Sequence, residues 1–311
     1  LLNVPNCGGS TSKFNTGLPV CDIIRDQPYM LFAADKGVEF SPADMADIDT
    51  FVAKVQELSR APRGGRIYPI SGLTNFEDNS KEATKATIGN LTTSEVTKNE
   101  AIPAFTFQHY KGDLFHQQLG WGETANLTWF ILDKKYLMAG TAKSSGNFAG
   151  YTTTEFKALQ PKFATATETA KYPFSIVFAS LAEHKENFAF VQLDETIVNV
   201  SGVIPVTLKE ASIATNTISV KAVARGGKSM GVNFATELAD TDAWVVTKDS
   251  DGSTVTTSGV TYNSTTDKFQ IVTSGLSTGD VVNVTMAICQ DLSDLGVDGY
   301  EAENTVQVTK P

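Results

Sequence analysis

Residues 203–311 contain seven short runs of β-branched and aromatic residues. Turn sequences, such as the one at 249–252, lie between these runs. Short strands spaced roughly a dozen residues apart over about 100 residues are typical of an immunoglobulin-like β-sandwich. Trp244 is the expected core tryptophan. The cysteine pair that joins the sheets of antibody domains is missing, because Cys289 stands alone in this region. The expected strands are 204–208, 217–223, 243–247, 259–262, 268–272, 281–287 and 305–308.

Residues 21–202 are expected to form a larger β-rich body. Runs such as 104–110, which alternate aromatic with polar residues, indicate half-buried strands. A weaker helix is expected near 116–121, and residues 1–20, rich in Gly, Ser, Asn and Thr, predict an extended arm that orders only when something ties it down. The predicted fold class is mainly β: a β-barrel or sandwich body with one flanking α-helix, followed by the immunoglobulin-like sandwich. The expected strands of the body are 21–24, 29–33, 67–70, 104–110, 127–132, 136–139 and 174–179.

The flanking helix is predicted to begin after Ser41. Ser41 is a good N-cap, Pro42 suits the first helical position, and Asp44 stands three residues after the cap. Pro62 and Gly64 end the helix. Apolar residues at spacings of three and four form one face, which packs on the protein's own sheet or binds a partner. These residues are Met45, Ile48, Phe51, Val52, Val55 and Leu58.

Composition limits the classes of function. A chain of 311 residues is long enough for two domains, and 41% hydrophobic residues exclude wholesale disorder. The formal net charge of −10 disfavours non-specific nucleic-acid binding, which needs a basic face. Three cysteines are too few for a disulfide-rich secreted scaffold, so Cys7 and Cys21 either pair or remain free thiols. No apolar run approaches the roughly 18 residues of a membrane helix, so no membrane partner is expected.

Catalytic and metal-binding motifs are missing from the sequence. It contains no His-Glu-x-x-His, Cys-x-x-Cys or Gly-x-Ser-x-Gly pattern and no dinucleotide fingerprint. His109 and His116 could share a site, but the preferred interpretation is that they are ordinary strand or surface histidines. The turn 249–252 lacks the ligand series of an EF-hand, and 226–229 lacks the first glycine of a phosphate loop. The number of carboxylates does not exclude a catalytic pair of the glycosidase kind. Such clefts usually carry clustered tryptophans and tyrosines, however, and the three tryptophans of this chain are scattered. The prediction is therefore a protein without enzymatic activity, cofactor or metal.

The stretch between residues 73 and 103 is polar and about 30 residues long, which is unusual inside a compact domain. It is either a plain polar hairpin or a segment that a neighbouring molecule orders. In the second case its few apolar residues would dock on the neighbour, because so polar a segment cannot bury enough apolar area to order itself. The predicted subunit-interface residues are Phe76, Asn79, Ile88, Leu91 and Val96.

The middle of the chain carries a resemblance. Its features are, in order, residues 66–70, 73–80, 97–100, 105–107 and 114–119, a hairpin around Asp133, and 148–151. This order resembles the virion structural proteins of tailed bacteriophages of gut Bacteroidetes, especially tail-tube-like proteins, over roughly residues 20–200. The resemblance implies a β-barrel or sandwich body that forms a ring of subunits. It also implies an immunoglobulin-like domain displayed outward.

The expected function is therefore that of a structural component of the virion: a tail tube protein that assembles into stacked rings around a DNA channel. Its partners would be other copies of itself and other virion proteins, and an acidic channel would let DNA pass without sequence-specific binding. One alternative is a capsid decoration or auxiliary protein. Another is a bacterial cell-surface adhesive or glycan-binding protein, which should show an aromatic binding platform.

Overall fold

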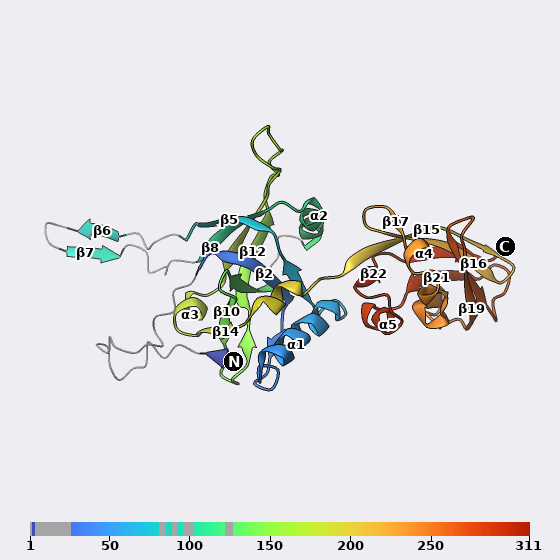
Figure 1. The fold of residues 1–311 in the computed structure, drawn as a ribbon, viewed down its shortest axis with the longest axis horizontal. Helices are drawn as coiled ribbons and strands as arrows, with labels where there is room; N and C mark the ends of the chain where they lie inside the picture. The colour runs from blue at the N-terminus through green and yellow to red at the C-terminus, as the bar shows by residue number, and fades with distance from the viewer. Residues whose placement is uncertain (1, 4–25, 81–84, 89–91, 96–102, 122–126) are drawn as a thin grey trace. The chain divides into compact units, whose positions relative to one another are not determined.

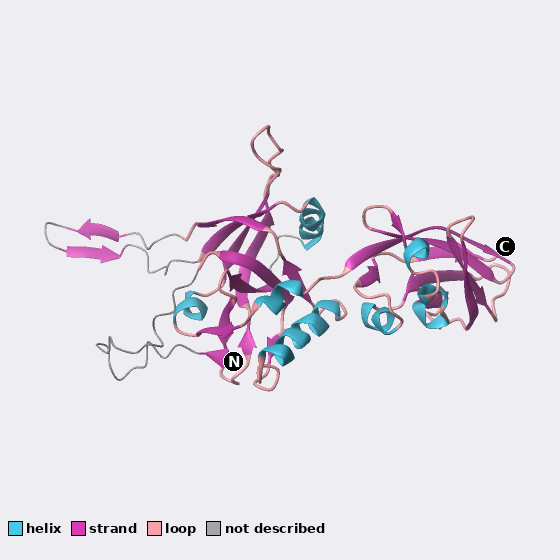
Figure 2. Ribbon diagram, viewed as in Figure 1, coloured by secondary structure: helices cyan, strands magenta, loops and turns pink. Residues whose placement is uncertain are grey.

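The computed structural model describes residues 2–3, 26–80, 85–88, 92–95, 103–121 and 127–311. It confirms the mainly β fold, with several sheets and few helices (Figures 1 and 2). The chain divides into two compact units. The first comprises Leu1–Ser59 and Arg63–Val200, and the second comprises Arg60–Pro62 and Ser201–Pro311.

Among the described residues of the first unit, twelve strands form one sheet and two further strands form a separate one. The twelve are β1 (Leu2–Asn3), β2 (Pro28–Asp35), β3 (Glu39–Phe40), β4 (Ile67–Ile70), β5 (Leu73–Asp78), β8 (Ala104–His109), β9 (Leu127–Asp133), β10 (Leu137–Ala142), β11 (Phe148–Ala149), β12 (Tyr151–Ala158), β13 (Tyr172–Phe178) and β14 (Phe188–Gln192). The separate pair is β6 (Lys85–Ile88) and β7 (Thr92–Glu95). The helical segments are α1 (Ile48–Arg60), α2 (Gly112–Trp121), α3 (Leu181–Lys185) and the 3₁₀ helix η3 (Glu195–Asn199).

The large sheet curls into a barrel-like body. Antiparallel pairings run from β4 through β2, β9, β12, β13 and β8 to β5. β4 and β5 are consecutive in the chain, so the short link between them joins the two ends of this series. Gly72 in the link has a φ of +81°, and a Cβ there would lie 2.9 Å from the Tyr110 ring. Glycine is therefore needed at this bend, because it adopts a positive φ readily and has no side chain to clash with the Tyr110 ring.

Two cores lie on opposite faces of β2, because successive side chains of a strand point to opposite sides. All residues from 30 to 34 are buried. Leu31 belongs to a core with Phe107 and Trp129, which come from strands of the barrel-like series. Phe32 belongs to a second core, which the sheet shares with α1.

Helix α1 packs on the protein's own sheet, as one of the two interpretations of its apolar face predicted. Phe51 and Val55 are fully buried in the second core, and the Phe51 ring centroid lies 4.5 Å from that of Phe40. Val52 and Leu58 are partly buried against the same core. The 3.6-residue period of the sequence therefore placed the buried stripe correctly.

The predicted start of this helix was wrong. Ser41 and Asp44 do exchange the two bonds of a capping box, Ser41 N to Asp44 Oδ2 at 2.7 Å and Asp44 N to Ser41 Oγ at 3.3 Å. They close only a turn, and α1 begins at Ile48. Asp47 is the working cap, because its Oδ1 accepts a hydrogen bond from Thr50 N at 2.8 Å. The chain carries two cap signals, and the second one starts the helix.

The second unit contains all seven strands expected from the sequence, in two sheets. Its strands are β15 (Ile204–Ala214), β16 (Thr217–Ala224), β17 (Lys228–Ser229), β18 (Trp244–Lys248), β19 (Thr257–Asn263), β20 (Lys268–Thr273), β21 (Val281–Met286), β22 (Tyr300–Ala302) and β23 (Val306–Thr309). Its helical segments are α4 (Met230–Asn233), η4 (Glu237–Ala239), η5 (Thr241–Ala243) and α5 (Cys289–Asp294).

The strand order of this unit is that of a constant-type immunoglobulin sandwich. One sheet runs β19-β20-β16-β15-β22 and the other runs β18-β21-β23. With β15, β16, β18, β19, β20, β21 and β23 named A to G, the sheets read D-E-B-A and C-F-G. Strands β17 and β22 are additions to the first sheet, and β22 runs parallel to β15.

Both sheets of the second unit contribute to one core. Val220 and Phe269 come from the first sheet, and Trp244 and Val284 come from the second. Trp244 is 4% exposed, and its Nε1 donates a hydrogen bond to Leu238 O at 2.9 Å, so the expected core tryptophan is confirmed. Cys289 is buried in this unit.

Few parts of the N-terminal arm are described. Within 1–20 only β1 is described, where Leu2 pairs with Val191 of β14. Cys7, Cys21 and the strand expected at 21–24 lie outside the described residues, so these predictions stay as they were.

Candidate subunit interface

The predicted interface segment is rooted on a pair of neighbouring strands. β5 and β8 are antiparallel, and Asp78 at the end of β5 lies opposite Phe105 at the start of β8. Ala104 N donates a hydrogen bond to Ser80 Oγ at 3.1 Å, which closes the pair at this end. The sequence left open whether the polar stretch 73–103 is a plain hairpin or a segment that a neighbour orders. The stretch begins with β5, a strand of the body that no pattern predicted, and it contains the β6–β7 hairpin. β5 escaped notice because it lacks the dense apolar pattern of its neighbour.

Two of the predicted interface residues make contacts inside the body. The Phe76 ring is partly buried, with its centroid 5.2 Å from that of Phe105 and 5.3 Å from that of Phe107. The exposed Asn79 donates from Nδ2 to Thr106 Oγ1 at 2.8 Å. Both side chains therefore hold the root of the segment in place.

The middle of the segment contains the hairpin of β6 and β7. In its register Ile88 lies opposite Thr92, and the two strands form a sheet of their own. Leu91 and Val96 lie outside the described residues. Within the described ranges, no strand of the large sheet pairs with β6 or β7. An isolated two-stranded hairpin is marginally stable in water, so a third strand or a packing partner would stabilise this one.

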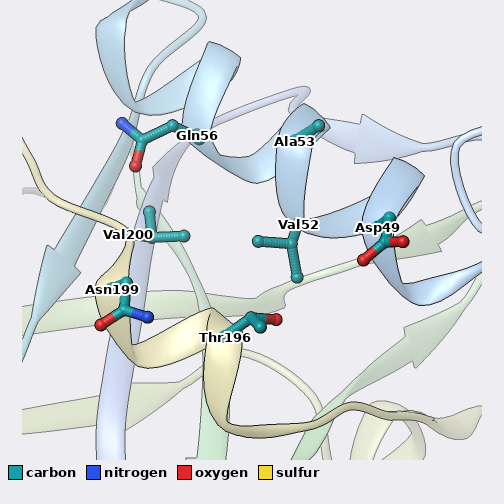
Figure 3. A pocket seen from close by; sticks show the side chains of 7 residues that line it. All are labelled: Asp49, Val52, Ala53, Gln56, Thr196, Asn199 and Val200. Carbon is teal, nitrogen blue, oxygen red and sulfur yellow. The ribbon is translucent and has the colours of Figure 1, made fainter.

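A groove open to solvent lies between α1 and η3 (Figure 3). Val52 and Val200 face each other across it, and its volume is about 320 Å³. The exposed surface of the groove is mostly apolar. Its lining residues are Asp49, Val52, Ala53, Gln56, Thr196, Asn199 and Val200.

Two carboxylates that stand two residues from the groove lining in the sequence carry stable negative charge. Asp47 caps α1, and hydrogen bonds from Thr50 lower the pKa of its carboxyl. Asp194 caps η3, where the hydroxyl and the backbone N–H of Thr196 lower the pKa of the carboxyl. Asp49 lines the groove itself. A cationic or mixed basic and apolar ligand would therefore suit this surface.

The histidine pair considered from the sequence does not present an accessible ligand set. His109 is fully buried, its Nδ1 accepts a hydrogen bond from Lys111 N at 3.2 Å, and its Nε2 lies 3.0 Å from Gln118 Oε1. Burial lowers the pKa of His109, so the ring is neutral near pH 7. The side chain of His116 is outside the described residues.

The weak ligand signals of the second unit belong to turns. In the turn at 249–252, Asp251 Oδ1 accepts hydrogen bonds from Ser253 N and Oγ at 2.9 and 2.7 Å. The segment 226–229 forms a turn that leads into β17, and Ser229 Oγ donates to Asp267 Oδ1. These polar groups stabilise the local fold.

Among the described residues, no group of three or more His, Cys, Asp or Glu side chains could hold a metal ion. In the same part of the chain, no helix is both long and apolar enough to cross a membrane. No protein-family model matches the chain, and no curated protein matches it.

Sequence reasoning missed two surface features. The groove brings together residues from 49–56 and 196–200, and no motif links these segments. The other feature is Phe163, which is 91% exposed in the connection between β12 and β13. A lone phenylalanine in a run of Lys, Thr and Ala was a signal that could have drawn attention to it.

Proposed function

We propose that this protein is a self-assembling structural subunit of a bacteriophage virion, most specifically a tail tube protein that forms stacked rings around a DNA channel. Its partners are further copies of itself and other virion proteins. DNA passes near it without sequence-specific binding. The protein is located in the virion and has no enzymatic role.

The observation that carries this proposal is the β6–β7 hairpin. The hairpin is a two-stranded sheet inserted at one end of the β5–β8 pair, and both of its strands have an unpaired edge among the described residues. Unpaired edges are templates for pairing with another chain, and a hairpin of this size gains most of its stability from such a partner. A repeating assembly supplies the partner at every subunit.

The net charge of −10 supports the same proposal. A channel that conducts DNA must not bind phosphates, and an acidic wall repels them. The barrel-like body with one packed helix also agrees with the fold that the resemblance to tail-tube-like proteins implies.

Electron microscopy and analytical ultracentrifugation of the purified protein test the proposal. We expect rings or tubes, with a sedimentation coefficient that rises with protein concentration. Monodisperse monomers at all concentrations would contradict it. Monomers that bind only to preformed capsids would indicate a decoration protein, and monomers retained on a glycan array would indicate an adhesive surface protein.

A further inference from the structure

Phe163 is an apolar side chain with almost no contacts in its own subunit. It lies in the connection between β12 and β13, drawn in yellow-green in Figure 1, and is 91% exposed. The connection is itself ordered by mutual backbone hydrogen bonds between Lys162 and Lys171, at 2.9 and 3.0 Å, and by a bond from Thr165 N to Glu168 O at 2.9 Å. An ordered loop therefore presents one aromatic ring to solvent.

The groove between α1 and η3 has the apolar middle that such a ring needs. Val52, Ala53 and Val200 line it, and the open side leaves room for an incoming side chain (Figure 3). Phe163 of the same subunit is exposed and so does not occupy it. We call the exposed Phe163 side chain the knob. The knob and the groove can therefore meet only between two molecules.

The charges around the two features are opposite. The stretch 157–171, which carries Phe163, has three lysines and one glutamate. The segments 47–57 and 194–200, which contain all the lining residues of the groove, have five carboxylates and one lysine, and Asp49 is the carboxylate in the lining itself. Opposite charges at matching surfaces guide association and suppress wrong partners, so a second copy of this chain is the occupant that these charges favour.

We infer that Phe163 of one subunit inserts into the α1–η3 groove of a second copy, with the lysines of its loop near the carboxylates of 47–57 and 194–200. This inference rests on the proposed self-assembly and names a contact that drives it. Because knob and groove are different patches of one molecule, the contact is heterologous. Repetition of a heterologous contact gives a closed ring or an open filament.

The first test is Phe163→Ala. Truncation of a side chain that is 91% exposed should leave the melting temperature unchanged. The protein concentration needed for assembly should rise by about tenfold or more, since aromatic anchors dominate interface energies. The matched control is Val232→Ala, at a 76% exposed valine of the second unit, which should change neither quantity. Equal assembly of the Phe163→Ala protein and the parent would overturn the inference.

The second test reverses the charges. Lys162→Glu should weaken assembly, and the added change Asp49→Lys should restore it, because the exchanged charges attract again. Additive weakening by the two changes would contradict the predicted pairing.

A third test does not depend on visible assemblies. Two full-length proteins, each with Cys7 and Cys21 changed to Ser, carry either Ala164→Cys beside the knob or Ala53→Cys in the groove. We expect a disulfide-linked dimer when the two are mixed under oxidation. A mixture of the Ala53→Cys protein with a Ser253→Cys control should give none.

The outcomes separate this contact from the proposed function. Rings without the cross-link would overturn the contact and leave self-assembly standing. The cross-link without rings or tubes would support the contact and count against the tail tube. Absence of both would count against both.

Discussion

His109 and Gln118 form a buried pair at the end of β8, with His109 Nε2 3.0 Å from Gln118 Oε1. Lys111 N donates to His109 Nδ1, so the neutral ring carries its proton on Nε2 and donates it to Gln118. The imidazole also stacks on Tyr172, with ring centroids 5.9 Å apart. Protonation of Nδ1 would break the bond from Lys111 and place a charge among aromatic rings.

The stability of the first unit should therefore fall in mild acid. Burial lowers the pKa of His109 from 6.5 in the folded state, so the unfolded chain binds a proton first as the pH falls. The free energy of unfolding should decrease below about pH 6.5, by up to about 1.4 kcal/mol per pH unit until the folded pKa is reached. Urea unfolding between pH 5 and 8 measures this. His109→Gln should remove the slope in that range, and an unchanged slope would assign it to other groups.

Phe51 should be essential to the packing of α1. Its side chain is fully buried, and its ring centroid lies 4.5 Å from that of Phe40. Phe51→Ala should lower the free energy of unfolding by about 3–5 kcal/mol, because it leaves a cavity in the core. Ala53→Ser, at an exposed position of the same helix, is the control and should change it by less than about 0.5 kcal/mol. A loss below about 1 kcal/mol for Phe51→Ala, with assembly abolished, would place that face in an interface.

Gly231 should tolerate no side chain. A Cβ on Gly231 would lie 2.0 Å from Cε2 of Tyr262, whereas a Cβ on Gly259 meets nothing within 4 Å. Gly231→Ala should destabilise the second unit by about 1–3 kcal/mol, and Gly259→Ala should be nearly neutral. Thermal melts of the two variants make the comparison. Equal melting temperatures would show that the Tyr262 ring moves aside without cost.

The strongest local patterns predicted the fold well. The alternating strand at β8 and the hairpin of β9 and β10 around Asp133 were expected, and so were the strands of the second unit. Asp133 fixes that hairpin, because its Oδ1 accepts hydrogen bonds from Lys135 N and Leu137 N at 2.8 and 2.9 Å. Such signals are local, and a single sequence carries them.

The elements that the sequence patterns did not predict depend on tertiary structure. β12 begins Tyr151-Thr-Thr-Thr-Glu, a polar run whose position between β9 and β13 is set by its neighbours. β5 is mostly polar and becomes a strand by pairing with β8. The groove likewise exists only because α1 and η3 meet, with Val52 and Val200 far apart in the sequence. No local pattern contains that information.

The second unit should fold alone. Ser201–Pro311 contains both of its sheets and a core to which both contribute. A fragment of residues 201–311 should therefore melt in one cooperative transition and bind little hydrophobic dye. The matched variant Trp244→Ala should lose about 3–5 kcal/mol, since Trp244 is 4% exposed. A non-cooperative melt of the parent fragment would contradict the independence of this unit.

Removal of residues 81–102 should separate folding from assembly. Asp78 of β5 lies opposite Phe105 of β8, so a short glycine-containing turn in place of this segment leaves an ordinary β-hairpin. The body should stay folded, because Phe76 and the Asn79–Thr106 hydrogen bond are retained. We expect a monomer with a melting temperature close to that of the parent, and no rings or tubes by electron microscopy. A second variant replaces only residues 92–95 of β7 with Gly and Ser. This change keeps the length of the segment but weakens the hairpin, so the variant should also assemble poorly. Rings from the excised protein would show that the β6–β7 hairpin is not needed between subunits.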